Sequence, residues 1–169
     1  MATVRVIGDT FVEDVELFHA GLTLTTNVIV LDNIAFGTII DDDSLVLRAE
    51  FGNQKAISLD SPFLLKDPFP VLNTLNFSLD GRTRIMLLAT GIRLAPGEDA
   101  TAVTAVAEDQ QGGLHPLTVE FVGTVPDLNW LQQVVVKLPD SLTNTGSALV
   151  SISLHGSSSN KVRIAIKSP

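Results

Sequence analysis

Apolar and polar residues alternate along the last part of the chain. Between 148 and 154 every second residue is Ala, Val, Ile or Leu, and Ser fills most of the positions between them. Residues 162–167 alternate in the same way, and Leu117, Val119 and Phe121 alternate with Thr, Glu and Val. A period of two residues is that of a β-strand with one buried and one solvated face. These segments are therefore predicted to be strands that cover a core.

Comparable runs recur along the chain at intervals of about 8–12 residues, the spacing of strands in an all-β sandwich. Two of them, 28–31 and 85–89, are apolar on both faces, which predicts either central strands covered on both sides or surfaces that meet a partner. The best helical candidate, 99–108, contains Thr and Val that favour a strand, and a single helical turn is expected at 139–142. The predicted fold class is all-β, with strands at 3–8, 12–18, 22–31, 34–40, 45–51, 55–59, 76–79, 82–91, 102–108, 117–122, 131–138, 148–154 and 162–167.

Prolines interrupt the strand pattern between the two halves of the chain. Pro62, Pro68 and Pro70 lie close together, and a proline cannot donate the hydrogen bond that a central strand requires. Residues 63–74 are therefore predicted to be a linker, or an edge strand that crosses between two modules. The expected organisation is two immunoglobulin-like β-sandwich modules in tandem, at 1–62 and at 75–169.

The second half carries a recognisable set of segments between about 75 and 167. The most specific are the strand Gln-Val-Val-Val-Lys-Leu-Pro at 133–139 and the pair Ser159-Asn160, and 82–92, 117–123 and 125–128 add to them. In these segments the chain resembles an uncharacterised immunoglobulin-like C-terminal domain of secreted bacterial proteins, notably of acidobacteria. The resemblance implies an extracellular or surface sandwich and transfers no active site.

The first half has a Gly-x-x-Phe pattern at 8–11, a strand followed by a glycine at 15–21, a further strand at 43–48, and Ser-Pro-Phe at 61–63. It is similar to the immunoglobulin-like domains shared by plexins and transcription factors, the IPT/TIG type. Such domains have a strand before the Gly-x-x-Phe segment, whereas few residues precede Gly8 here. The resemblance therefore implies a first sandwich that lacks a strand unless the linker or another subunit supplies it.

The bulk composition narrows the classes of protein. Hydrophobic residues make up 45% of the chain and charged residues 18%, which indicates a globular rather than a disordered chain. The net charge of −8 would repel phosphate backbones, so nucleic acid is not an expected partner. There is no cysteine, and no apolar run reaches the roughly 20 residues of a membrane span. We therefore expect no transmembrane segment. The resemblance implies an extracellular or cell-surface location, with a signal peptide already removed.

Asp41, Asp42 and Asp43 form the densest acidic cluster of the sequence. Three carboxylates supply the hard oxygen ligands that Ca²⁺ prefers. Their spacing lacks the alternation of an EF-hand loop, so a solvated turn is the favoured interpretation and a Ca²⁺ site is the alternative. No cofactor is predicted.

The histidines and the single tryptophan are the remaining candidates. His19, His115 and His155 form no His-x-x-x-His pair, and a metal or catalytic role would require all of them to converge. We expect His115 and His155 to be exposed turn residues. Trp130 is expected in a sandwich core or at a domain interface rather than as a ligand platform. One Trp and no Tyr also leave few rings for stacking on sugars.

No nucleophile elbow, phosphate-binding loop or metalloprotease motif occurs in the sequence, so a protein without enzymatic activity is predicted. The expected function is that of an extracellular structural protein that acts through its sandwich surfaces. It would assemble with copies of itself into a fibre or surface layer by strand pairing, or pair with another surface protein. The alternative is a binding or adhesion module for protein or glycan, or an export-associated C-terminal domain of a larger secreted protein.

Overall fold

The computed structural model describes residues 16–21, 34–39, 44–76 and 78–168. Contacts within the chain divide it into two compact units, Met1–Ser44 and Leu45–Pro169. In both, the regular structure consists of strands apart from two short 3₁₀ turns among the described residues, so the predicted all-β class is confirmed.

The described part of the first unit is a two-stranded antiparallel ribbon. Strand β1 (Glu16–Gly21) pairs with β2 (Ile34–Ile39) in continuous register. Phe18 lies directly opposite Gly37, and its ring covers the space that a side chain at Gly37 would need. The strand predicted at 34–40 is confirmed over 34–39, and residues 16–18 of the strand predicted at 12–18 lie in β1. Residues 12–15 and 40, like the strands predicted at 3–8 and 22–31, lie outside the described residues.

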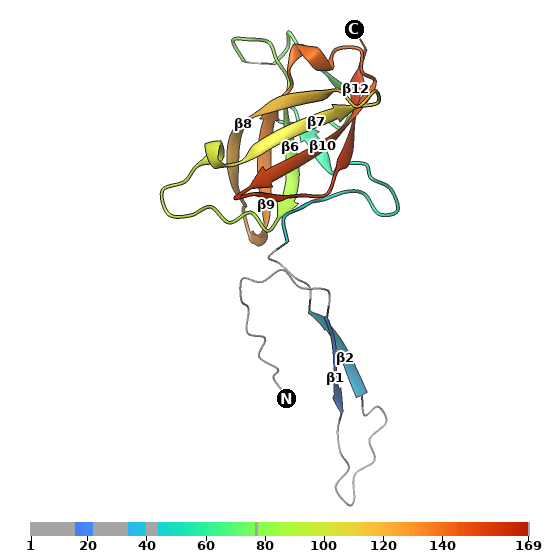
Figure 1. The fold of residues 1–169 in the computed structure, drawn as a ribbon, viewed down its shortest axis with the longest axis vertical. Helices are drawn as coiled ribbons and strands as arrows, with labels where there is room; N and C mark the ends of the chain where they lie inside the picture. Colours follow the sequence, from blue (N-terminus) through green and yellow to red (C-terminus); the bar gives the residue numbers. More distant parts are fainter. Residues whose placement is uncertain (1–15, 22–33, 40–43, 77, 169) are drawn as a thin grey trace, which may run out of the picture. The chain divides into compact units, whose positions relative to one another are not determined.

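The second unit contains one long sheet that curls around a core (Figure 1). The strands are β3 (Val46–Leu47), β4 (Ser58–Asp60), β5 (Phe69–Pro70), β6 (Arg84–Thr90), β7 (Thr104–Asp109), β8 (Leu114–Val125), β9 (Leu128–Lys137), β10 (Ser147–Leu154), β11 (Ser157–Ser158) and β12 (Val162–Lys167). Their order in the sheet is β3-β6-β9-β8-β7-β10-β12-β5, with β4 also pairing with β6 and β11 with β10. The 3₁₀ turn η2 (Asp140–Leu142) confirms the turn expected at 139–142, and η1 (Ala100–Ala102) precedes β7.

The inward-facing residues of this sheet make one core. In β10 and β12 the residues that alternate inward are buried, as the sequence pattern predicts. β6 is a central strand between β4 and β9. Its inward residues Ile85, Leu87 and Ala89 are buried, while Met86 and Leu88 on the other face are half-buried. The run 85–89 is thus a central strand of the sheet, but it is not covered on both sides, and the alternative of a surface that meets a partner stays a prediction. The run 28–31 lies outside the described residues.

A bulge changes the direction of the side chains in the middle of β8. The register shifts between Val119, which pairs with Val136, and Phe121, which pairs with Val135. Val136 is buried in the core and Val135 is on the opposite face. The inserted residue, Glu120, therefore turns Phe121 outward. The expectation that Phe121 shares a face with Leu117 and Val119 is wrong, because a strict period of two holds only in an unbulged strand.

The prediction of a strand at 76–79 is wrong for the described residues of that range, 76, 78 and 79. Among the described residues this region is a set of turns closed by asparagine side chains. The Oδ1 of Asn73 accepts from the Leu75 N–H, and the Oδ1 of Asn76 accepts from the Ser78 N–H. Asn side chains of this kind compete with strand pairing for the backbone donors.

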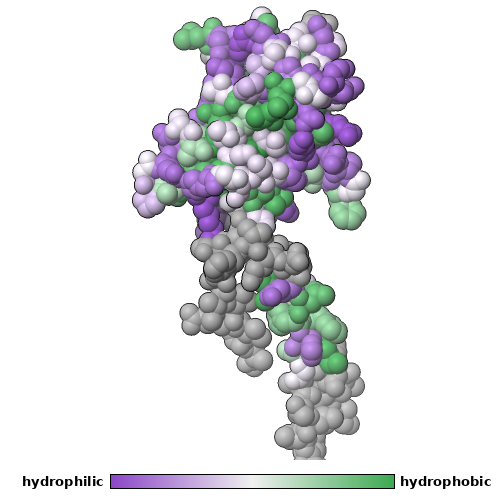
Figure 2. Space-filling model, in the orientation of Figure 1, coloured by the Kyte–Doolittle hydropathy of each residue, from purple (hydrophilic) through white to green (hydrophobic). Residues whose placement is uncertain are grey.

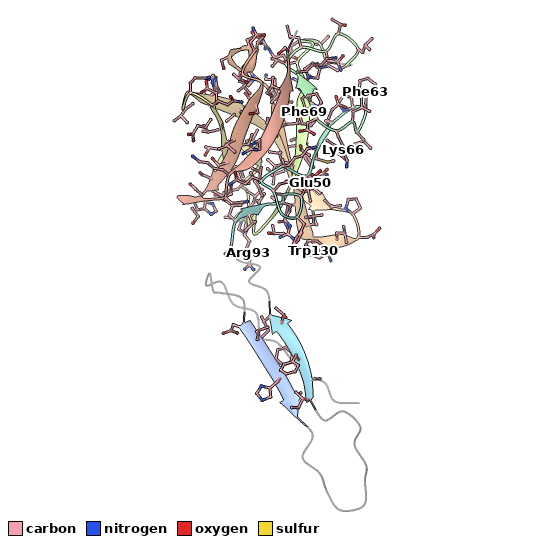
Figure 3. The ribbon with its side chains drawn as sticks, turned by 90° about the vertical axis from the view of Figure 1, so that its right-hand side faces the viewer. Glu50, Phe63, Lys66, Phe69, Arg93 and Trp130 are labelled. Carbon is pink, nitrogen blue, oxygen red and sulfur yellow. The ribbon has the colours of Figure 1, made fainter. Side chains whose placement is uncertain are left out.

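The proline-rich segment belongs by its contacts to the second unit. β5 pairs in parallel with the edge of β12, at Ile166 and Lys167, as an edge strand can despite its proline. Phe69 is 1% exposed and Val71 is 4% exposed, and both are part of the core. Figure 3 shows the Phe69 ring among the strands, whereas Phe63 and Lys66 lie on the loop at the margin. The contact boundary thus lies near residue 44, before the predicted linker 63–74.

Asn160 closes the curled sheet where its two ends meet. The Leu47 N–H of β3 donates to the Oδ1 of Asn160 at 2.7 Å, and the Nδ2 of Asn160 donates to the Leu47 carbonyl at 3.0 Å. The side-chain amide thereby takes the place of a paired strand residue. Nearby, the Ala56 N–H donates to the Arg163 carbonyl at 2.8 Å. The Asn of the Ser159-Asn160 pair thus has a structural role here.

We expect Asn160→Ala to lower the free energy of unfolding by about 1–3 kcal/mol, because both backbone groups of the buried Leu47 lose their partner. Asn160→Asp should also destabilise the protein, since it removes the donor to the Leu47 carbonyl. Urea unfolding followed by circular dichroism measures both. Asn129→Ala, at an exposed position of β9, is the control. Equal stability of Asn160→Ala and the control would contradict this role.

Candidate functional surfaces

Apolar side chains line up across four strands on the outer face of the second unit. Leu59 of β4 pairs with Met86 of β6, Met86 with Val135 of β9, and Val135 with Phe121 of β8. The first three are half-buried, and Phe121 is 47% exposed. Gly123 lies beneath the Phe121 ring, since a Cβ there would be 2.5 Å from its Cζ. The row is therefore an apolar strip open to solvent.

Charged side chains gather beside this strip around Arg84. Its Nε and Nη2 donate to the Glu120 carboxylate at 2.8 and 3.0 Å, and its Nη1 and Nη2 donate to Asp80. The Nζ of Lys137 lies 3.6 Å from a Glu120 oxygen and 3.7 Å from an Asp80 oxygen. Only 19% of the Arg84 side chain is exposed. The bulge in β8 brings Glu120 to this position.

A second ion pair completes what we call the Arg84 network, which consists of Arg82, Arg84, Lys137, Asp80, Glu120 and Asp140. Both Nη atoms of Arg82 donate to the Asp140 carboxylate. The hydrogen bonds from Arg84 hold the pKa of Asp80 well below its usual range, and those from Arg82 lower the pKa of Asp140. The network has as many cations as anions, so it carries no formal net charge at neutral pH.

The strip and the network border a groove of about 620 Å³, which we call the outer-face groove. Val135 and Gln133 of β9 line it together with Phe121 and Glu120 of β8. The remaining lining residues are Ser61, Pro62, Asn76, Ser78, Arg82 and Arg84. Asn76 is 9% exposed, and its side chain donates to the Arg82 carbonyl at 2.8 Å. This hydrogen bond anchors the loop that contains Asn76, which forms one wall of the groove.

The β1–β2 ribbon of the first unit presents a different kind of surface. Leu17 is 79% exposed and Phe36 is 82% exposed. Both belong to the face that also carries His19 and Thr38, since Leu17 pairs with Thr38 and His19 with Phe36. Figure 2 shows hydrophobic side chains, in green, over much of the described part of this ribbon. The described ribbon therefore exposes large apolar side chains without a core of its own.

The calcium candidates Asp41, Asp42 and Asp43 lie outside the described residues. Elsewhere, in the part of the chain that the structure describes, no group of three or more His, Asp and Glu side chains is arranged to hold a metal ion.

Each histidine has its own local partner. The His19 ring lies 6.4 Å from the Phe36 ring. The Nε2 of His115 lies 2.8 Å from Asp109, whose pKa it lowers, and His155 lies 2.9 Å from Glu98. The His155 side chain is 52% exposed, as expected for a turn, but the His115 side chain is only 14% exposed. The prediction of His115 as an exposed turn residue is wrong, because His115 lies in β8, paired with Ala107 of β7, and its ring contacts Asp109 of the same hairpin.

Trp130 is not a core residue. It lies on β9 with 55% of its surface exposed, and Figure 3 shows it at the end of the second unit. The prediction of a core position is therefore wrong, and the alternative of a domain interface stays a prediction. The neighbouring Gln132 has a buried Oε1 without a hydrogen-bond partner among the described residues.

The sequence pattern does not identify the outer-face groove. Glu120 and Phe121 reach it only because of the bulge, and the pattern places Asn76 and Ser78 in a strand. A usable signal is present in Gly123, because a glycine within a strand often marks a bulge or a close contact.

Comparisons with protein families, with curated proteins and with solved structures find no match to this chain. The immunoglobulin-like family and the tandem arrangement of two sandwiches therefore remain predictions. Within the described ranges, no helix has the length and apolar character needed to cross a membrane.

Proposed function

We propose that this chain is a non-enzymatic structural subunit, with an extracellular or cell-surface location, that assembles with copies of itself through the β1–β2 ribbon. The observation that carries the proposal is the exposure of Leu17 and Phe36 on a ribbon of only two described strands. A two-stranded ribbon is marginally stable in water by itself and gains stability from further strands or from an apolar face to pack on.

The strand edges favour pairing between chains. In the described residues β1 and β2 pair only with each other, and no strand pairing is described on the second edge of either strand. Such edges accept a strand from another molecule. Repeated contacts of this type produce rings or open filaments.

Charge also favours a second copy of the chain as the partner of the β1–β2 ribbon. The chain carries a net charge of −8, so two copies repel each other over most surfaces. In the described ribbon Glu16 is the only Asp, Glu, Lys or Arg residue. The ribbon is thus a surface at which two acidic copies meet with little repulsion.

The test introduces two lysines on the exposed ribbon face, as Leu17→Lys with Phe36→Lys. We expect the wild-type chain to form oligomers or filaments and this variant to sediment as a monomer, because charges would be buried in the interface. Sedimentation velocity and negative-stain electron microscopy measure the outcome.

The matched control is Phe51→Lys with Leu114→Lys, which adds the same charge at exposed positions of the second unit. It should assemble like the wild type. A wild-type chain that stays monomeric at all soluble concentrations would refute the proposal, and so would a ribbon variant that assembles normally.

A further inference from the structure

The outer-face groove has the dimensions of a ligand site. Its volume of about 620 Å³ falls within the range of about 300–1,000 Å³ that is typical of small-molecule sites. The strands that line it, β6, β9 and β8, are each hydrogen-bonded to strands on both sides. These strands therefore offer no free edge, and recognition must come from side chains.

The charges beside the groove are already paired. Arg84 is held by both Asp80 and Glu120, and Arg82 is held by Asp140. An anionic ligand would have to displace these carboxylates, and a cationic ligand would have to displace the guanidinium groups. A neutral ligand avoids both costs and can still use the outward lone pairs of the carboxylates.

The uncharged groups suit a ligand that is apolar on one side and polar on the other. Phe121 presents a ring that is 47% exposed and is held over Gly123. Gln133 of β9 pairs with Gly123 of β8, two residues along each strand from the pair of Val135 and Phe121. Within the described residues, the side chains of Gln133 and Ser61 have no hydrogen-bond partner. An aromatic face, a free amide and a free hydroxyl thus line one open groove.

We propose that the outer-face groove binds a neutral saccharide. The C–H face of one sugar ring lies against Phe121, and the amide of Gln133 and the carboxylate of Glu120 bond its hydroxyl groups. Sugars combine apolar C–H faces with many hydroxyls and no charge, which matches this lining. The low count of aromatic residues does not oppose the site, because one well-placed ring serves one sugar ring.

The full-length chain is screened on an array of neutral and anionic oligosaccharides, and each hit is titrated by isothermal calorimetry. We expect at least one neutral oligosaccharide to bind. Phe121→Ala should raise its Kd about tenfold, because the stacking contact is lost. Gln133→Leu, which keeps the volume but removes the amide, should raise it about fivefold.

The control Phe51→Ala removes an equally large, fully exposed ring from the same unit and should leave the Kd unchanged. Phe121 and Gln133 lie outside the core, so both variants should keep the wild-type circular dichroism spectrum and melting temperature. The proposal is overturned if no neutral oligosaccharide binds, if only anionic ones bind, or if Phe121→Ala and Gln133→Leu both bind as tightly as the wild type.

Discussion

A fragment of residues 45–169 should fold and unfold in a single cooperative transition, whereas a fragment of residues 75–169 should not fold. The second fragment lacks β3, β4 and β5, and with them the core residues Leu47, Phe69 and Val71. Burial of a large apolar side chain contributes about 1.5–3 kcal/mol. Loss of these three alone would remove about 5–9 kcal/mol, a large part of the roughly 5–15 kcal/mol that stabilises a domain.

Lost backbone pairing adds to this effect. β4 covers one side of β6, and Leu47 receives the side chain of Asn160. Without them, the edge of a central strand is exposed and the fragment should aggregate. Thermal unfolding by circular dichroism, with size-exclusion chromatography, separates the outcomes. A soluble 75–169 fragment that melts as cooperatively as 45–169 would support the boundary predicted from the prolines instead.

Phe69→Ala should destabilise the protein more than Asn160→Ala does. The Phe69 ring is 1% exposed in the core, and replacing a buried Phe by Ala costs about 3–5 kcal/mol through lost burial and the cavity that remains. If residues 63–74 were only a linker, the same change would have little effect. Urea unfolding of the full chain measures the difference in the free energy of unfolding.

Phe51→Ala is the matched control, because Phe51 is fully exposed on a turn. Its change in unfolding free energy should lie within about 0.5 kcal/mol of zero. A Phe69→Ala variant with the stability of this control would show that the proline-rich segment does not belong to the core of the second unit.

The amino-acid sequence by itself determined the class of the fold and most of its strands. The period of two in 148–154 and 162–167 identifies the inward residues correctly, because a strand in register has no freedom to turn its side chains elsewhere. Composition determined that no disulfide and no thiolate metal site exists, since there is no cysteine. The proline-rich segment was also readable as an edge strand, which is the form that β5 takes.

Only the tertiary structure shows which side chains form the outer-face groove and the Arg84 network. One inserted residue in β8 turns Phe121 from the core to the outer face, and an alternating sequence pattern does not reveal such a bulge. The Arg84 network joins Arg84 to Glu120 across 36 positions of sequence, and Asn160 meets Leu47 across 113. Contacts at such separations depend on how the sheet curls and closes. That is set by the packing of the whole core, whereas a sequence pattern records only the preferences of neighbouring residues.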